Sequence, residues 1–329
     1  MADLSTIDLS DLNNYIDEDT AFLCWASFEF RGKTISLALD TAKTNASYIF
    51  YDCYYDATPA ASEISEHLDC GELKLMDLSN PTRIADTFAK VIEEIRDNGI
   101  ERITIDITTF THESLLILLR ILLLHKESFK QIRCLYTGAQ DYGGTFVPPE
   151  QKWLSKGCKD VRNVVGYPGI LRPSAKTCLI VLAGFELERA TRLIELIEPD
   201  RIAIGNGIEP VNENLSDTVK YFRNRFDDWR KEYRNRNCES FEFSCKDIIS
   251  TVALIEKIVG DAPNDNFILV PLNTKLSTIA SALVAFRNPK IQLCYSIPEI
   301  YNMGNYSTPD SKITIFDLDN IESCETPIP

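Results

Sequence analysis

The sequence contains the same succession of segments twice, and this repeat constrains the fold more than any other feature. Each copy begins with an apolar run that leads into Ala, a small residue and Phe-Glu, with an arginine two or three places later. Two later segments also recur in the same order and at nearly constant spacing. The matching pairs are 23–31 with 180–189, 103–109 with 268–274, and 132–137 with 291–296. A repeat of this length predicts two duplicated domains rather than a solenoid of short repeats.

Apolar runs of strand length alternate with segments of helical periodicity in both copies, as is typical of α/β domains. We therefore predict an α/β fold of two duplicated Rossmann-like domains with mostly parallel sheets, related by a pseudo-twofold axis. The first domain is expected at 1–146 and the second at 177–329, with a connector rich in Pro and Gly at 147–176 between them. A further antiparallel edge strand is expected at 312–317, in the second domain.

The formal net charge is −15, which argues against sequence-independent binding of nucleic acid, because such binding needs positive surface. One local exception is the segment 220–236, which holds seven basic and three acidic residues with aromatic residues between them. One interpretation is that this segment binds an acidic partner or nucleic acid. The pattern favours instead a long helix whose aromatic side chains pack inward, namely Tyr221, Phe222, Phe226, Trp229 and Tyr233.

Residues 1–19 lack the pattern of a signal peptide, and the longest apolar run, 115–124, is too short to cross a bilayer. The ten cysteines are scattered without a Cys-x-x-Cys pair, and the sequence has three histidines. This pattern predicts free thiols in a reducing cytosol, and neither a zinc site nor another cofactor. We expect a cytoplasmic protein that is not bound to a membrane.

Ligands of open parallel sheets bind outside the carboxyl ends of the strands, where free amides of helix starts favour phosphate. The repeated turns place small and polar residues at these ends. In the first copy the predicted ligand-binding residues are Ser27, Glu29, Arg31, Asp106, Thr108, Thr109 and His112. In the second copy they are Gly184, Glu186, Arg189, Asn273, Thr274 and Lys275. The simpler interpretation is structural: Phe-Glu-x-Arg is an internal brace in which Glu pairs with Arg, and Asp106 caps a helix.

Two of these turns resemble a known family. The segment 106–112 is similar to the Asp/Asn-x-Ser/Thr-x-x-x-Lys/Arg signature of CARF domains, the CRISPR-associated Rossmann folds, with His112 at the last position. The segment 272–275 resembles the Gly-Thr-Lys turn of some CARF domains, with Asn273 in place of glycine. SAVED domains resemble two fused CARF-like units, the arrangement expected here over 20–306.

The resemblance implies a sensor of a cyclic or linear nucleotide in a bacterial antiphage or CRISPR-related system, with a protein partner that carries the effector activity. It also implies which residues contact the ligand, namely Thr108, Thr109, His112, Asn273, Thr274 and Lys275. We expect the phosphate-bearing ligand to bind between the two repeats.

Two alternatives remain open at this point. The chain can be a structural adaptor that binds no ligand. It can also be an enzyme that processes a nucleotide with paired carboxylates drawn from Glu29, Asp106 and Glu186. The sensing or accessory subunit ranks first, the adaptor second and the enzyme third, so catalytic residues are not assigned.

Overall fold

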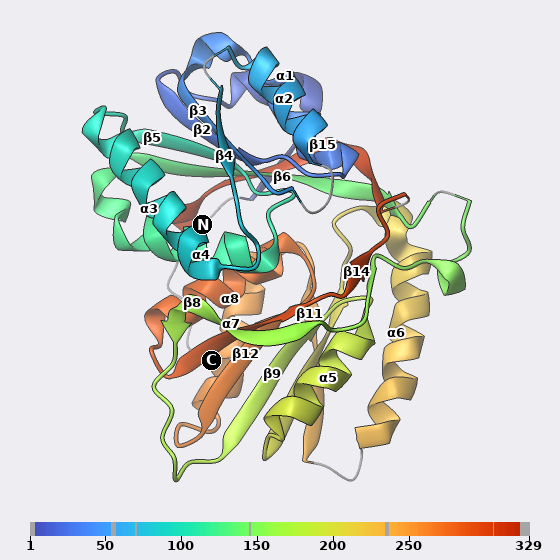
Figure 1. Ribbon diagram of the computed structural model, residues 1–329. Coiled ribbons are helices and arrows are strands. Elements are labelled where there is room, and N and C mark those ends of the chain that lie inside the picture. Colours follow the sequence, from blue (N-terminus) through green and yellow to red (C-terminus); the bar gives the residue numbers. More distant parts are fainter. Residues whose placement is uncertain are drawn as a thin grey trace. The chain divides into compact units, whose positions relative to one another are not determined.

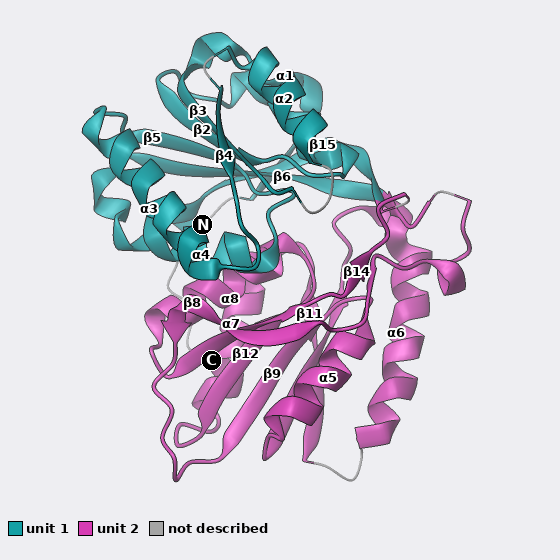
Figure 2. Cartoon of the chain, viewed as in Figure 1, with its two compact units in different colours: residues 1–140, 307–324 teal, residues 141–306, 325–329 magenta. Residues whose placement is uncertain are grey.

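The computed structural model describes residues 4–53, 57–69, 71–144, 146–233, 237–304 and 306–322. The chain divides into two compact units (Figure 2). Unit 1 comprises Met1–Gln140 and Ser307–Cys324, and unit 2 comprises Asp141–Tyr306 and Glu325–Pro329. No helix within the described ranges is long and apolar enough to cross a membrane.

Unit 1 is built on a seven-stranded sheet with the order β1-β15-β6-β5-β2-β3-β4 (Figure 1). The strands are β1 Ser5–Asp8, β2 Thr20–Trp25, β3 Thr44–Tyr51, β4 Gly71–Leu75, β5 Arg102–Asp106, β6 Gln131–Tyr142 and β15 Ser307–Asp317. The five strands from β4 to β6 pair in parallel, and β1 pairs antiparallel with β15. Numbered along the chain, the parallel strands have the order 3-2-1-4-5, which is that of the Rossmann fold.

The helices of unit 1 are α1 Thr34–Ala38, α2 Thr58–His67, α3 Pro81–Asp97, α4 His112–Leu124 and α9 Leu318–Glu322. The side chain of Asn80 accepts from the Arg83 amide at the start of α3, and apolar residues at helical spacing bury one face of this helix. Helix α4 is apolar almost all round and is mostly buried, as the sequence predicted for 115–124, although Leu124 at its end is exposed. Phe50, Phe88 and Phe110 pack together in the core, with Phe50 edge-on to Phe88 at 4.8 Å between ring centroids.

Unit 2 repeats the strand order of unit 1. Its six-stranded sheet has the order β11-β10-β9-β12-β13-β8, in which the first five strands pair in parallel. The strands are β8 Asp160–Pro168, β9 Thr177–Ala183, β10 Arg201–Ile208, β11 Cys238–Ser244, β12 Asn266–Pro271 and β13 Ile291–Ile297. The strands β7 Ser155–Lys156 and β14 Ile300–Tyr301 form a separate antiparallel pair. The predicted α/β class with mostly parallel sheets is confirmed.

The helices of unit 2 are α5 Leu187–Ile197, α6 Ser216–Arg230, α7 Ile248–Gly260 and α8 Lys275–Arg287. Apolar residues of α5 and α6, together with Tyr233 just beyond α6, share a core cluster with β9, β10 and β12. The interpretation of 220–236 as an amphipathic helix is largely confirmed, because Phe222 and Phe226 are buried while Arg223 and Arg225 are exposed. Residues 234–236 of this segment lie outside the described ranges.

Two expectations about the organisation of the chain were wrong. The strand expected at 312–317 is β15, which belongs to unit 1, where it lies between β1 and β6. Its pairing depends on segments far away in the sequence, so periodicity could not reveal it. The expected connector 147–176 contains β7 and β8 and is part of unit 2, where β8 pairs antiparallel with β13. The pseudo-twofold relation between the repeats stays a prediction.

Candidate ligand-binding pocket

The first repeated turn of unit 1 forms an internal brace. Arg31 is buried and donates from Nη2 to Glu29 Oε2 at 2.8 Å and from Nη1 to the carbonyl oxygen of Thr137 at 3.3 Å. The hydroxyl of Ser307 in β15 also donates to Glu29 Oε2, at 2.8 Å. Ser27 Oγ accepts from the amide of Glu29 at 3.4 Å. These contacts tie the end of β2 to β6 and β15, and they include the Glu–Arg pair that the structural interpretation of Phe-Glu-x-Arg predicted.

The second turn of unit 1 is held by internal hydrogen bonds, although the buried Asp106 Oδ2 has no hydrogen-bond partner among the described residues. Asp106 is 2% exposed, and its Oδ1 accepts from the Thr108 amide at 3.0 Å. Burial raises the pKa of Asp106 to about 7, although hydrogen bonds from Thr108 and the charge of Arg31 act in the opposite direction. Thr108 Oγ1 accepts from the Thr137 amide at 3.0 Å, and Thr109 Oγ1 donates to the carbonyl of Trp25 at 2.5 Å.

His112 is the first residue of α4, which Thr111 caps. Glu29 is paired with Arg31 and Asp106 is buried, so neither of these two carboxylates is freely accessible to solvent.

The corresponding turns of unit 2 hold the strand ends together in a related way. A Cβ on Gly184 would overlap with the carbonyl oxygen of Leu272, so the small residue permits close approach of two chain segments. Asn273 Nδ2 donates to the carbonyl of Ala183 at 2.6 Å. Thr274 caps α8 by accepting from the Ser277 amide at 3.2 Å, and Lys275 is the first residue of that helix.

Arg189 in helix α5 makes a further bracing contact at this end of the sheet. It is buried and donates from Nη2 to the carbonyl oxygen of Ser296 in β13, and its guanidinium carbon lies 5.5 Å from the ring centroid of Tyr295. Of the thirteen residues predicted to bind a ligand, Glu186 is the one that lines the described pocket of unit 2. The others are placed in or beside the bracing contacts at the carboxyl ends of the two sheets.

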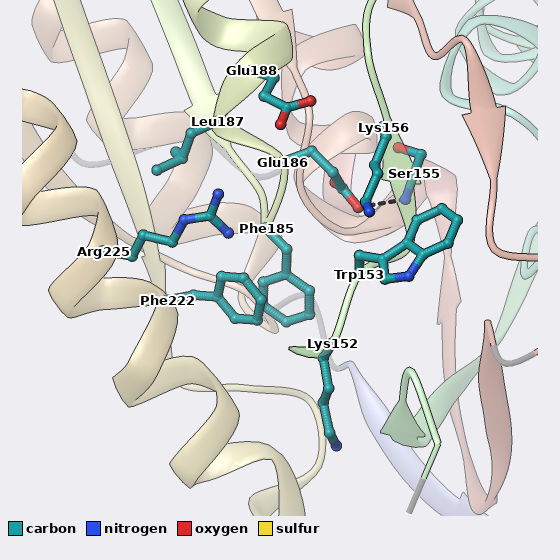
Figure 3. Close-up of a pocket in the computed structure, with 10 residues that line it drawn as sticks. All are labelled: Lys152, Trp153, Ser155, Lys156, Phe185, Glu186, Leu187, Glu188, Phe222 and Arg225. Carbon is teal, nitrogen blue, oxygen red and sulfur yellow. Dashed lines mark hydrogen bonds between the residues drawn. The ribbon is translucent and has the colours of Figure 1, made fainter. Parts of the chain in front are cut away.

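A pocket that is partly open to solvent lies beside the turn that joins β9 to α5 in unit 2 (Figure 3). Three separate stretches of chain line it: residues 152–156, the β9–α5 turn with the first two residues of α5, and helix α6. The lining residues are Lys152, Trp153, Ser155, Lys156, Phe185, Glu186, Leu187, Glu188, Phe222 and Arg225. The first β–α turn of a Rossmann-type sheet is the place where such folds approach a phosphate group.

Aromatic rings shape one side of the pocket. Phe185 and Phe222 are stacked, with ring centroids 4.2 Å apart and an angle of 16° between the ring planes. The edge of Tyr142 meets Phe185 at 5.5 Å. Trp153 is half-buried, and the ammonium group of Lys156 lies 4.5 Å from the centroid of its ring. The pocket therefore offers apolar faces beside a positive charge.

The charges of the pocket are only partly compensated. Lys152 is buried and pairs with Asp141. Within the residues that the structure describes, Lys156 and Arg225 form no ion pair, and both side chains are exposed. Desolvation raises the pKa of Glu186, opposed by the charge of Arg189 and by backbone hydrogen bonds, one of them from Ser155.

Most of this pocket could not be found from the sequence. Phe185 and Glu186 were singled out by the repeat, but Trp153 and Lys156 fell in the segment taken for a connector. Arg225 was assigned to a solvated helix face, as many charged residues are. The available signal was the interleaving of basic and aromatic residues in 220–236, where Phe222 and Arg225 lie one turn apart on α6.

The chain thus has an α/β fold with Rossmann-type strand order in both units. No family model matches the sequence, and no curated protein matches it. Among solved structures, the complex of leucoanthocyanidin reductase with NADPH from Vitis vinifera is similar over 82% of this chain and 88% of that chain, at 10% identity and a TM-score of 0.25. An N-terminal ketoreductase from the macrolactin assembly line is similar over 82% of this chain and 64% of that chain, at 8% identity and a TM-score of 0.22.

Proposed function

We propose that the chain is a cytoplasmic subunit that senses a small phosphate-bearing nucleotide, and that the pocket of unit 2 holds this ligand. The observation that carries the proposal is the position of Lys156 and Arg225, two cations without ion-pair partners in the described structure, beside Trp153 and the Phe185–Phe222 stack. Cations suit a phosphate group and aromatic faces suit a base.

The proposal assigns the phosphate group and the base of the nucleotide to different sides of the pocket. The phosphate is expected near Lys156 and Arg225, which face the pocket from the segment 152–156 and from helix α6 (Figure 3). The base is expected against Trp153 or Phe185. This location differs from the one expected from the sequence, because all lining residues belong to unit 2.

Calorimetric titration with AMP, ADP, cyclic di-AMP and inorganic phosphate tests the proposal. The wild-type chain is expected to bind at least one nucleotide more tightly than inorganic phosphate, because phosphate alone gains nothing from the aromatic faces. Arg225→Gln and Lys156→Gln are each expected to weaken that binding roughly tenfold, as for the loss of one charge-assisted hydrogen bond.

Arg223→Gln is the matched control for these variants. Arg223 lies two residues before Arg225 on the same helix, is exposed, and pairs with Glu242 instead of lining the pocket. It should bind nucleotide as the wild type does. Absence of binding of every nucleotide to the wild type, or equal affinities in all four proteins, would refute the proposed site.

The proposal includes a protein partner that carries the effector activity in an antiviral defence system, as the CARF-like turns imply. A sensing subunit of this kind has an affinity for its partner that changes when the nucleotide is bound, because the two binding events are linked. Co-purification of the tagged chain from its host with and without the nucleotide that binds in calorimetry tests this part. A partner recovered to the same extent in both conditions, and with Arg225→Gln, would exclude the sensing role.

A further inference from the structure

One wall of the pocket is the segment 152–157, which we call the strap. It contributes Lys152, Trp153, Ser155 and Lys156 to the lining. Its cations and its indole ring can serve a ligand only if the backbone of the strap is held in one place.

On one side, the strap is fixed by strand β14 and the residues around it. Ile300 and Tyr301 of β14 pair with the two strap residues of β7. The amide of Asn302 donates to the carbonyl of Leu154 at 2.8 Å, and its side-chain Nδ2 donates to the carbonyl of Trp153 at 2.9 Å. The amide of Glu299 donates to the carbonyl of Lys156 at 3.1 Å.

On the other side, the strap is fixed by two carboxylates at the start of α5, Glu186 at its N-cap position and Glu188 in its first turn. Glu186 Oε1 accepts from the Ser155 amide at 2.9 Å, which Figure 3 shows as a dashed line. Glu188 Oε2 accepts from the Gly157 amide at 3.1 Å. The two bonds lie on either side of Lys156, the residue whose ammonium group is placed over Trp153.

These carboxylates are unsuited to contact an anion directly, because like charges repel. Their hydrogen bonds with the backbone N–H groups of Ser155 and Gly157 indicate a structural role in the same pocket. We infer that Glu186 and Glu188 are positioning residues, which hold the strap so that Lys156 and Trp153 meet the ligand, without touching its phosphate themselves. The inference rests on the proposed function for its ligand, but the holding of the strap is measurable in the ligand-free protein.

Hydrogen–deuterium exchange of the ligand-free chain, together with AMP titration, tests the inference. In Glu186→Gln and Glu188→Gln, the amides of Ser155 and Gly157 are expected to exchange at least severalfold faster, because each loses a charged acceptor. If AMP is the nucleotide bound, its dissociation constant should rise about tenfold in each variant. Glu195→Gln is the control, since Glu195 lies on the same helix but is exposed and pairs with Arg192 at 3.3 Å.

The two readouts separate failure of the inference from failure of the proposed function. Unchanged exchange in both variants would overturn the inference, whatever the affinity. Tighter AMP binding by Glu186→Gln or Glu188→Gln would also overturn it, because it would show that the carboxylates act mainly by repelling the anion. A wild-type chain that binds no nucleotide would refute the proposed function, while faster exchange in the variants would still show that the carboxylates hold the strap. The exposed Glu188 keeps the test decisive if Glu186→Gln fails to fold.

Discussion

Arg31 and Arg189 make the same hydrogen bond in the two units of the chain. Each lies in or after the first β–α turn of its sheet and donates to a carbonyl oxygen of the fifth parallel strand, Thr137 in β6 and Ser296 in β13. Both guanidinium groups are buried. The shared strand order alone shows only that the two units have the same fold. The buried arginine contact at equivalent positions is a second, more specific similarity between the two repeats.

Loss of Arg31 from its buried contacts is expected to lower the free energy of unfolding of unit 1 by several kilocalories per mole. Arg31→Met would leave Glu29 half-buried without its charged partner, and removal of one partner of a buried ion pair costs about 3–5 kcal/mol. Urea denaturation monitored by circular dichroism should show this loss in free energy of unfolding. The double variant Glu29→Gln, Arg31→Met should recover part of it, and a loss that is fully additive would contradict the pairing.

The raised pKa of Asp106 makes the stability of the chain depend on pH in a defined direction. Its carboxyl binds a proton up to about pH 7 in the folded state, whereas an unfolded Asp releases it near pH 4. Between these values the folded state binds more protons, so this group lowers the free energy of unfolding as pH rises, by roughly 1.4 kcal/mol per pH unit. Asp106→Asn should remove this slope while it keeps an acceptor for the Thr108 amide.

Urea titrations of the wild type and Asp106→Asn at several pH values between 4 and 7.5 provide the measurement. The difference in free energy of unfolding between the two proteins should grow in favour of the variant toward pH 7. A constant difference over this range would show that the carboxyl has an ordinary pKa.

The elements that the sequence predicts well are those with a strong local signal. Strand β9, Thr177–Ala183, is buried on both faces of a parallel sheet, and such strands appear as continuous apolar runs. By contrast, β4 and β11 form sheet edges and carry alternating polar residues, so neither was predicted. The position of β15 depends on pairing with β1, some 300 residues away, and no local pattern encodes it.

In the candidate site, too, the sequence predicts the features that have a local signal and misses those that depend on the tertiary structure. The repeat correctly marked the turns at the strand ends, but their polar side chains mostly satisfy backbone groups there, as Asn273 does for the carbonyl of Ala183. Small and polar residues can form hydrogen bonds with the backbone at strand ends as readily as with a ligand, so the sequence pattern does not distinguish the two roles. The pocket instead gathers Lys156, Phe185 and Arg225 from segments that only the tertiary structure brings together.

Gly184 is expected to be essential for the packing of unit 2. In Gly184→Ala the added methyl group would overlap with the carbonyl of Leu272, which forces a backbone shift that costs about 1–3 kcal/mol. Gly260→Ala is the matched control, because a Cβ at Gly260, the last residue of α7, meets nothing within 4 Å. Thermal unfolding should show a lower midpoint for the first variant and an equal or higher one for the second. Equal midpoints in both would contradict the close approach.

Trp153 supplies the last test, because it links the strap to the ligand. Trp153→Leu keeps an apolar side chain but removes the aromatic face beneath Lys156 and the face available to a base. Stacking of a base on an aromatic side chain is worth about 1–3 kcal/mol, so affinity for the bound nucleotide should fall roughly tenfold or more while the weaker binding of inorganic phosphate changes little. Trp229→Phe serves as the control: Trp229 lies one turn beyond Arg225 on α6, does not line the pocket, and its indole N–H donates to Thr191 instead. Equal losses for nucleotide and inorganic phosphate in Trp153→Leu would show that the indole acts only by holding Lys156, and the base would then belong against Phe185.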